Sequence, residues 1–266
     1  MGSTALKILK ERLKGIYLHR HNLWDMAAAQ LKTKYVGSVL GISWAVINPL
    51  LIASVIAFVF FNIFKIEIKD FPLFVLSGIF PWMFFSCALS EATFSILNQQ
   101  NILHQFNLPR EILPMSSILS NFLNFLIGWF VIFPLFLFFN PRIILFLPLL
   151  TIVLLLTLIF TWGIGLIFSV LNVFFRDVGN LLNVLLMFWL WVTPVFYSAD
   201  MVPARFQWVS TFNPLTPYIA CYREVLLRGH IPSPGIFLEI FLWSFFSLLT
   251  GLTIFSHLET KILKRI

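Results

Sequence analysis

Six long apolar runs limit what this chain can fold into more than any other feature of its sequence. A helix that crosses the hydrocarbon core of a bilayer needs about 20 mostly apolar residues. Runs close to or above this length occupy 37–64, 71–97, 113–139, 143–175, 181–197 and 236–257. Charged residues make up only 11% of the 266 residues, too few to cover a water-soluble domain. The sequence therefore predicts an all-α integral membrane protein with six transmembrane helices.

Basic residues are distributed unevenly around these runs. Six spans place both termini on one side, and with the termini inside, twelve Lys and Arg residues face the cytoplasm and six face outward. Cytoplasmic loops of membrane proteins carry such an excess. We therefore predict a multi-pass protein of the cytoplasmic (inner) membrane with both termini in the cytoplasm. Because the basic residues flank the apolar runs, we expect the net charge of +7 to interact with membrane lipids and not with nucleic acid.

The first 35 residues favour helices outside the bilayer. Leu6, Leu9, Leu13 and Ile16 recur at helical spacing with basic residues between them, as in an amphipathic helix on a membrane surface. The alternative is a solvated basic tail. A second short helix is expected over 23–35. We treat the chain as a single transmembrane domain, with cytoplasmic interface helices at 1–35, spans one to five within 37–197, an extracytoplasmic segment at 198–234, span six at 236–257 and a cytoplasmic tail at 258–266.

The extracytoplasmic segment has an unusual apolar centre. Its part 213–229, NPLTPYIACYREVLLRG, is too short and too charged to cross the membrane, and Gly229 stands where a helix would stop. Irregular backbone at membrane depth is tolerated where protein buries it or where it lines a watery cavity. We expect a re-entrant hairpin of two half-helices before the last span. The alternative is a helix lying flat on the outer surface.

Residues for chemistry are sparse. None of the twelve glycines precedes a lysine, so the phosphate-binding G-x-x-x-x-G-K-[ST] motif is absent, and the five histidines do not cluster. Two acids, Glu91 and Glu239, lie within predicted spans, and we expect each to be paired or to reach an interface, without forming a proton relay. Cys87 and Cys221 are expected to be unpaired thiols. The chain is therefore predicted not to be an enzyme and to hold no cofactor or metal.

The loop 106–117, FNLPREILPMSS, sets Arg110 and Glu111 between two prolines in an otherwise apolar region. Pro109 suits a helix start, and a carboxylate in the first helical turn suits the helix dipole. Two interpretations stay open. The loop is either a tight polar turn between two helices or a short charged helix that docks a cytosolic partner.

Four stretches, in this order, resemble the permease subunits of polysaccharide-exporting ABC transporters, which move O-antigen, capsular and teichoic-acid polymers. They span most of the chain and read KYVGSVLGISWAVINPL at 34–50, FNLPREILPMSS at 106–117, FFRDVGNLL at 174–182 leading into TPVFYS at 193–198, and NPLTPYIACYREVLLRG at 213–229.

The resemblance implies a homodimer that works with two ATP-binding subunits, in which ATP and Mg are held by the partner and not by this chain. It implies an undecaprenyl-type lipid-linked polysaccharide as substrate. It gives Asp25, Arg110 and Glu111 the coupling to the ATPase. It also makes 203–230 a periplasmic gate, with Arg223, Glu224 and Tyr218 near the outer mouth.

Two further assignments concern charges and aromatic rings. We expect Arg176 and Asp177 to form a structural bridge at the inner end of spans four and five. Sugar rings have apolar C–H faces, so Trp82, Phe85, Trp189 and Trp191 are candidates for a sliding path, although Trp near span ends commonly marks the lipid interface.

Two other functions remain open. One is an ABC exporter permease for small lipids or drugs. The other, less favoured, is an integral membrane lipid-linked sugar transferase, which would need clustered acids or a metal site on one membrane face.

Overall fold

The computed structural model describes residues 12, 14–63, 68, 70–100 and 108–262, and the regular elements among them are all helices. Five of these helices are long and apolar enough to cross a membrane, over Gly41–Asn62, Phe71–Asn98, Ile112–Phe139, Pro141–Phe174 and Pro234–Glu259. A sixth apolar helix, Val178–Val192, is shorter. The predicted all-α membrane class is confirmed, and the count of six spans stays a prediction.

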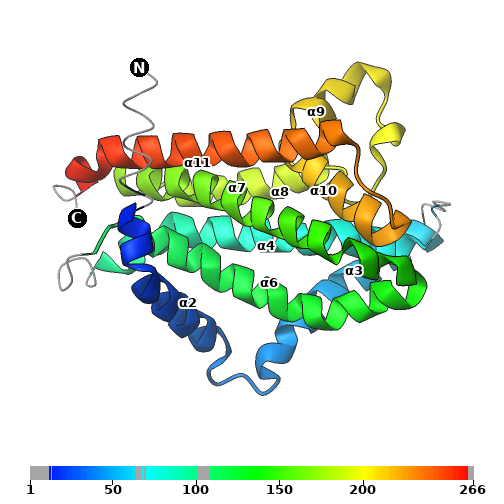
Figure 1. The fold of residues 1–266 in the computed structure, drawn as a ribbon, viewed down its shortest axis with the longest axis horizontal. Helices are drawn as coiled ribbons and strands as arrows, with labels where there is room; N and C mark the ends of the chain where they lie inside the picture. Colours follow the sequence, from blue (N-terminus) through cyan, green and yellow to red (C-terminus); the bar gives the residue numbers. More distant parts are fainter. Residues whose placement is uncertain (1–11, 13, 64–67, 69, 101–107, 263–266) are drawn as a thin grey trace.

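The elements follow one another as in Figure 1. Their bounds are α2 Arg20–Tyr35, η1 Gly41–Ser43, α3 Trp44–Asn62, α4 Phe71–Asn98, α6 Ile112–Phe139, η2 Pro141–Phe146, α7 Leu147–Phe174, α8 Val178–Val192, η3 Ala199–Met201, η4 Ala204–Phe206, α9 Gln207–Phe212, α10 Leu215–Arg223, η5 Glu224–Arg228 (a turn of π-helix) and α11 Pro234–Ile262.

Helix α4 lies at the centre of the bundle. Within its most apolar stretch 72% of the residues are buried, compared with 22–33% in the other four long helices. It packs against α3, α6, α7 and α8, and α10 covers part of it. Figure 1 shows α4, α6, α7 and α11 running side by side, with α9 and α10 at one end of the bundle. The interior of the chain is therefore organised around α4.

Helices α7 and α11 share the most extensive contact in the molecule, and they meet backbone to backbone. A Cβ atom on Gly163 would lie 2.2 Å from the carbonyl carbon of Ser247, and one on Gly251 would lie 2.3 Å from the carbonyl oxygen of Gly163. Ser244 Oγ also donates to the carbonyl of Leu156 across the same contact at 2.8 Å. Small residues let helices approach in this way where no hydrophobic effect drives their association.

Two predicted spans differ from the helices observed. The run 143–175 is divided between η2 and α7. The run predicted over 181–197 becomes α8, which starts three residues earlier, at Val178, and ends at Val192. It ends there because Thr193 is extended, as expected of a residue that precedes a proline. Fifteen residues extend about 22 Å, less than the roughly 30 Å hydrocarbon core.

The predicted regions outside the spans are described in part. Helix α2 confirms the short helix expected over 23–35, whereas most of the amphipathic helix expected before it lies outside the described residues. In the segment 198–234, α10 and η5 bury one face against the bundle, and Gly229 adopts the left-handed conformation (φ +61°) that ends the helix as predicted. The re-entrant depth of this segment stays a prediction.

Candidate functional site: a charge network at one end of the bundle

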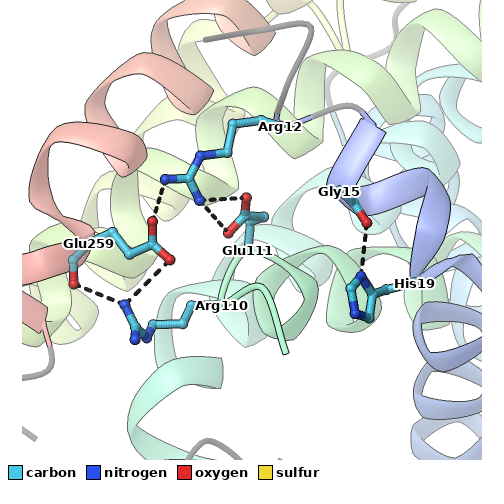
Figure 2. Close-up of polar contacts among 6 residues, drawn as sticks. All are labelled: Arg12, Gly15, His19, Arg110, Glu111 and Glu259. Carbon is cyan, nitrogen blue, oxygen red and sulfur yellow. Dashed lines mark hydrogen bonds and ion pairs between the residues drawn. The ribbon is translucent and has the colours of Figure 1, made fainter. Parts of the chain in front are cut away.

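Four charged side chains from three distant segments meet at the end of the bundle opposite α9 and α10 (Figures 1 and 2). Arg12 Nη1 lies 3.1 Å from Glu111 Oε1, and Arg12 Nη2 is ion-paired with Glu259. Arg110 Nη1 lies 3.3 Å from Glu259 Oε1 and donates to the carbonyl of Glu259 at 3.2 Å. We call these four residues the charge network. It joins the N-terminal region, the loop before α6 and the end of α11.

The loop before α6 positions its two charges through a tight backbone turn. Ile112 N donates to the carbonyl of Pro109 at 3.1 Å, and Leu113 N donates to that of Arg110 at 3.2 Å. Glu111 occupies the N-cap position of α6, where a carboxylate is favoured by the helix dipole. The next two side chains, Ile112 and Leu113, are fully buried and anchor this turn in the bundle. The turn is therefore held rigidly.

The network is electrically balanced, with two guanidinium groups and two carboxylates. Glu111 is only 1% exposed, so its charge depends on Arg12 for compensation. Partial burial disfavours the charged form of Arg12, but hydrogen bonds to Glu259 and Glu111 and their negative charges outweigh this, and the pKa of Arg12 is raised. Arg12 therefore stays charged at any physiological pH.

This geometry corrects one expectation and adds one residue. Glu111 is not presented to the cytosol, because its carboxylate is buried under Arg12. Asp25 is exposed on α2 and forms no ion pair with any described residue, so it does not join Arg110 and Glu111. Glu259 was missed by the sequence analysis. The available signal was an acid in the last turns of the final apolar run, on the same predicted side as Arg110.

A second polar cluster lies between α2, α4 and α6. Lys34 Nζ contacts Glu91 Oε1 at 2.8 Å and donates to Asn121 Oδ1 at 2.8 Å, while Asn121 Nδ2 donates to Glu91 Oε2 at 2.7 Å. Gln30 Nε2 also donates to Ser116 Oγ at 3.0 Å. The predicted pairing of Glu91 is confirmed. Glu239, the other acid within a predicted span, is exposed and has no ion pair with a described residue.

At the opposite end of the bundle, the predicted gate residues are held separately. Arg223 Nη2 donates to the carbonyl of Val195 at 2.7 Å, and its guanidinium lies 3.6 Å from the centroid of the Phe74 ring. Glu224 pairs with Arg228 at 2.5 Å, one helical turn away. Arg223 and Glu224 therefore do not pair with each other in this structure.

Tyr218 does not line a pathway in this structure. Its side chain is 1% exposed, and its hydroxyl donates to the carbonyl of Ile240 at 3.0 Å and lies 2.6 Å from Ser244 Oγ. Both partners belong to α11. Tyr218 thus links α10 to α11 by hydrogen bonds. Because its side chain is buried in this contact, its assignment to a substrate path is corrected.

Three of the four aromatic candidates pack together, and the fourth lies apart from them. Trp82, Phe85 and Trp189 form a cluster with ring centroids 5.4–6.3 Å apart, and the first two are at most 5% exposed. These two rings pack in the core of the chain, with Trp82 at the edge of a pocket between α4 and α8, which corrects their assignment to an open path. Trp191 is 56% exposed and packs beside Phe196, apart from the cluster.

The expected bridge between Arg176 and Asp177 is also corrected. Both side chains are exposed, and neither forms an ion pair with any residue that the structure describes. Neighbouring residues at the start of a helix point in different directions, so a direct contact is not favoured. Cys87 and Cys221 are free thiols as predicted. Across the described ranges no three His, Cys, Asp or Glu residues gather as metal ligands.

Comparison with known proteins relates this arrangement to a family. The model of the ABC-2 type transporter family matches residues 21–227, which include α2, the loop before α6 and α10. The chain belongs to the ABC-2 type transporter family. The resemblance to ABC transporter permeases drawn from the four sequence stretches is thereby confirmed.

Relatives within this family match nearly the whole chain. The chain is 33% identical to an O-antigen export system permease protein RfbA of Klebsiella pneumoniae over 232 residues, which cover 87% of this chain and 89% of the relative. It is 27% identical to an RfbA of Myxococcus xanthus, covering 83% and 85%. It is 24% identical to the polysialic acid transport protein KpsM of Escherichia coli, covering 99% of both chains.

Proposed function

We propose that this chain is the channel-forming permease subunit of an exporter that carries a lipid-linked polysaccharide across the cytoplasmic membrane, driven by ATP hydrolysis in a separate subunit. The observation that carries the proposal is the similarity, over 83–99% of the chain, to permeases and transport proteins named for O-antigen and polysialic acid. The five long apolar helices provide the membrane domain that such a permease needs.

The proposed assembly contains two copies of this chain and two ATP-binding subunits, which bind ATP and Mg. The substrate is an undecaprenyl-type glycan, and both termini lie in the cytoplasm. This chain itself performs no covalent chemistry and binds no cofactor. The nucleotide-binding motif missing from the sequence is supplied by the partner.

Coupling between the two kinds of subunit takes place at the charge network. A movement of the partner that displaces the loop before α6 would be passed through Arg110 to Glu259 and the end of α11, because these residues are in direct contact. The same movement would be passed from Glu111 to Arg12, and so to the N-terminal region. The charge network therefore connects the loop before α6, where the ATP-binding subunit would dock, to the N-terminal region and to the end of α11.

The test combines depletion with purification. Depleting the chain in its host should leave completed polymer on the cytoplasmic side of the membrane. Purifying the chain in mild detergent should recover an ATP-binding subunit in equal amount. Arg110→Ala should abolish polymer release while the complex still assembles. Continued export without the chain, or purification without any ATP-binding subunit, would contradict the proposal.

A further inference from the structure

A cavity of about 260 Å³ with both polar and apolar walls lies between α2, α3, α4 and α6, in the half of the bundle that carries the charge network. Its wall includes Lys34, Asn48, Glu91, Asn121 and Asn124. The last four belong to helices long enough to span the membrane, and Asn121 lies about 14 Å along α6 from its first residue. Polar and ionisable groups within a membrane-spanning helix are costly to place in lipid, and they commonly mark functional sites.

The charges in this cavity already satisfy each other. Lys34, Glu91 and Asn121 form the closed set of contacts described above, with one positive and one negative charge. The cavity therefore offers no uncompensated charge to an ion. Its spare hydrogen-bonding capacity lies elsewhere, in two amides.

Those two amides are Asn48 and Asn124. The Asn48 side chain is exposed on α3 and forms no hydrogen bond with any residue in the described part of the chain. Asn124 uses its Oδ1 to accept a hydrogen bond from the Tyr35 hydroxyl, and its amino group has no described partner. An amide both donates and accepts, as a sugar hydroxyl does. Trp44 and Phe84 add flat apolar surfaces to the same cavity.

An apolar groove of about 680 Å³ adjoins this cavity between α2 and α6, and Tyr35 lines both. Its walls include Trp24, Leu126 and Phe130. Among its described lining residues Lys32 is the charged one, and Lys32 is exposed with no ion pair to a described residue. A free ammonium beside an apolar groove suits the phosphate of a lipid.

We propose that the cavity and the groove together form a loading site for a lipid-linked glycan. The apolar chain lies in the groove, Lys32 faces the phosphate link, and the first sugar lies in the cavity against Asn48 and Asn124. Taken together, the volumes of about 260 and 680 Å³ fall within the range that small-molecule sites occupy, roughly 300–1,000 Å³. The proposal rests on the proposed function and adds to it where the substrate is first held.

The chain provides its own reporter for this site. Cys87 is exposed and lines the cavity, whereas Cys221 is fully buried. We would measure the rate at which a small methanethiosulfonate reagent labels Cys87 in the complete transporter, purified with its ATP-binding subunits in lipid nanodiscs. Cys87→Ser gives the background. The probes are a disaccharide joined to a prenyl chain by diphosphate, the same prenyl diphosphate without sugar, and the free disaccharide.

The full probe should slow Cys87 labelling several-fold at saturation, and the free disaccharide should not. Asn48→Ala should weaken protection by the full probe about tenfold, the equivalent of one hydrogen bond. The matched control is Asn62→Ala, at the other end of α3, where the amide already donates to the carbonyl of Phe58. Asn62→Ala should leave protection unchanged.

Two outcomes would overturn the loading site. One is labelling that no probe slows, and the other is equal protection by the prenyl diphosphate with and without sugar. Neither result depends on a variant folding, because both are obtained with the unmodified chain. Export is scored separately in cells depleted of the chain. Retained polymer with unprotected Cys87 refutes the loading site alone, and continued export refutes the proposed function.

Discussion

The side chain of Arg110, in the loop before α6, contacts both the side chain and the main-chain carbonyl of Glu259, near the end of α11. The guanidinium lies 3.3 Å from the carboxylate and donates to the carbonyl at 3.2 Å, across 149 positions of sequence. Because of this contact, the end of α11 and the loop before α6 lie side by side at the same end of the bundle. We therefore expect Glu259 to be as important for coupling as the loop itself.

Glu259→Gln should reduce ATP-driven polymer export without unfolding the protein. The side chain is 18% exposed, and partly exposed ion pairs contribute about 1 kcal/mol, which for a chain of this size corresponds to a decrease in Tm of a few degrees. Export should fall at least about fivefold if the same energy is lost from the coupling step. Export rate and Tm, measured on one preparation, separate the two effects.

The matched control is Glu239→Gln, on the same helix, because Glu239 is exposed and has no ion pair with a described residue. It should change neither quantity. Exchanging the charges, with Arg110→Glu and Glu259→Arg together, should recover part of the export. Full export by Glu259→Gln would show that the end of α11 is not involved.

Glu111→Ala should lower the stability of the folded protein. The carboxylate is 1% exposed, and its removal leaves Arg12 with Glu259 as its remaining described partner. Removing one member of a fully buried ion pair costs about 3–5 kcal/mol, and the 26% exposure of Arg12 should reduce this to about 2 kcal/mol. Thermal unfolding in detergent measures the change.

Asp25→Ala serves as the comparison, since Asp25 is exposed on α2 and unpaired among the described residues. Its Tm should equal that of the unmodified protein. A Glu111→Ala variant that is equally stable would mean that the buried contact with Arg12 contributes nothing.

Gly251→Ala should destabilise the contact between α7 and α11. The added methyl group would lie 2.3 Å from the carbonyl oxygen of Gly163, and a backbone atom in a packed helix cannot move aside cheaply. Overpacking of this severity costs about 3 kcal/mol, or a decrease in Tm of about 6–12 °C. Gly235→Ala on the same helix meets no atom within 4 Å and is the matched control. Equal melting temperatures would refute the close contact.

Trp82→Ala and Trp191→Ala should behave differently. Trp82 is 5% exposed, so its truncation leaves a cavity in the core and costs about 3–5 kcal/mol. Trp191 is 56% exposed, and its loss should cost less than about 1 kcal/mol. Export measured per folded complex should be nearly unchanged for Trp82→Ala, although less protein is recovered. A stable Trp82→Ala protein without export would restore Trp82 to the substrate path.

The transmembrane helices were predictable because a bilayer leaves the chain little choice. Backbone groups in hydrocarbon must be satisfied within their own segment, so a long apolar run becomes a helix. The run 71–97 corresponds to α4, Phe71–Asn98, within one residue at its end. The run 181–197 was placed less well, because hydropathy continues through Pro194, whereas the helix stops before it.

The charge network was only half predictable. Proline and charge patterns singled out Arg110 and Glu111, but their partners lie 99 to 149 positions away in the sequence. Such pairings depend on how the helices pack, and no local pattern encodes them. The same reason explains why the aromatic candidates were misjudged. Trp82 and Trp191 look alike in sequence, and only packing buries one and exposes the other.

The crossing of Gly163 and Gly251 determines which parts of this molecule can change shape. At Gly163 and Gly251 main chain meets main chain, so neither helix can slide past the other there without a backbone clash, and α7 and α11 form a rigid pair. Helix α3 has 22% of its most apolar stretch buried, and α8 is short, with three of its fifteen residues buried. We therefore expect any change of shape to move these two outer helices relative to the α7–α11 pair.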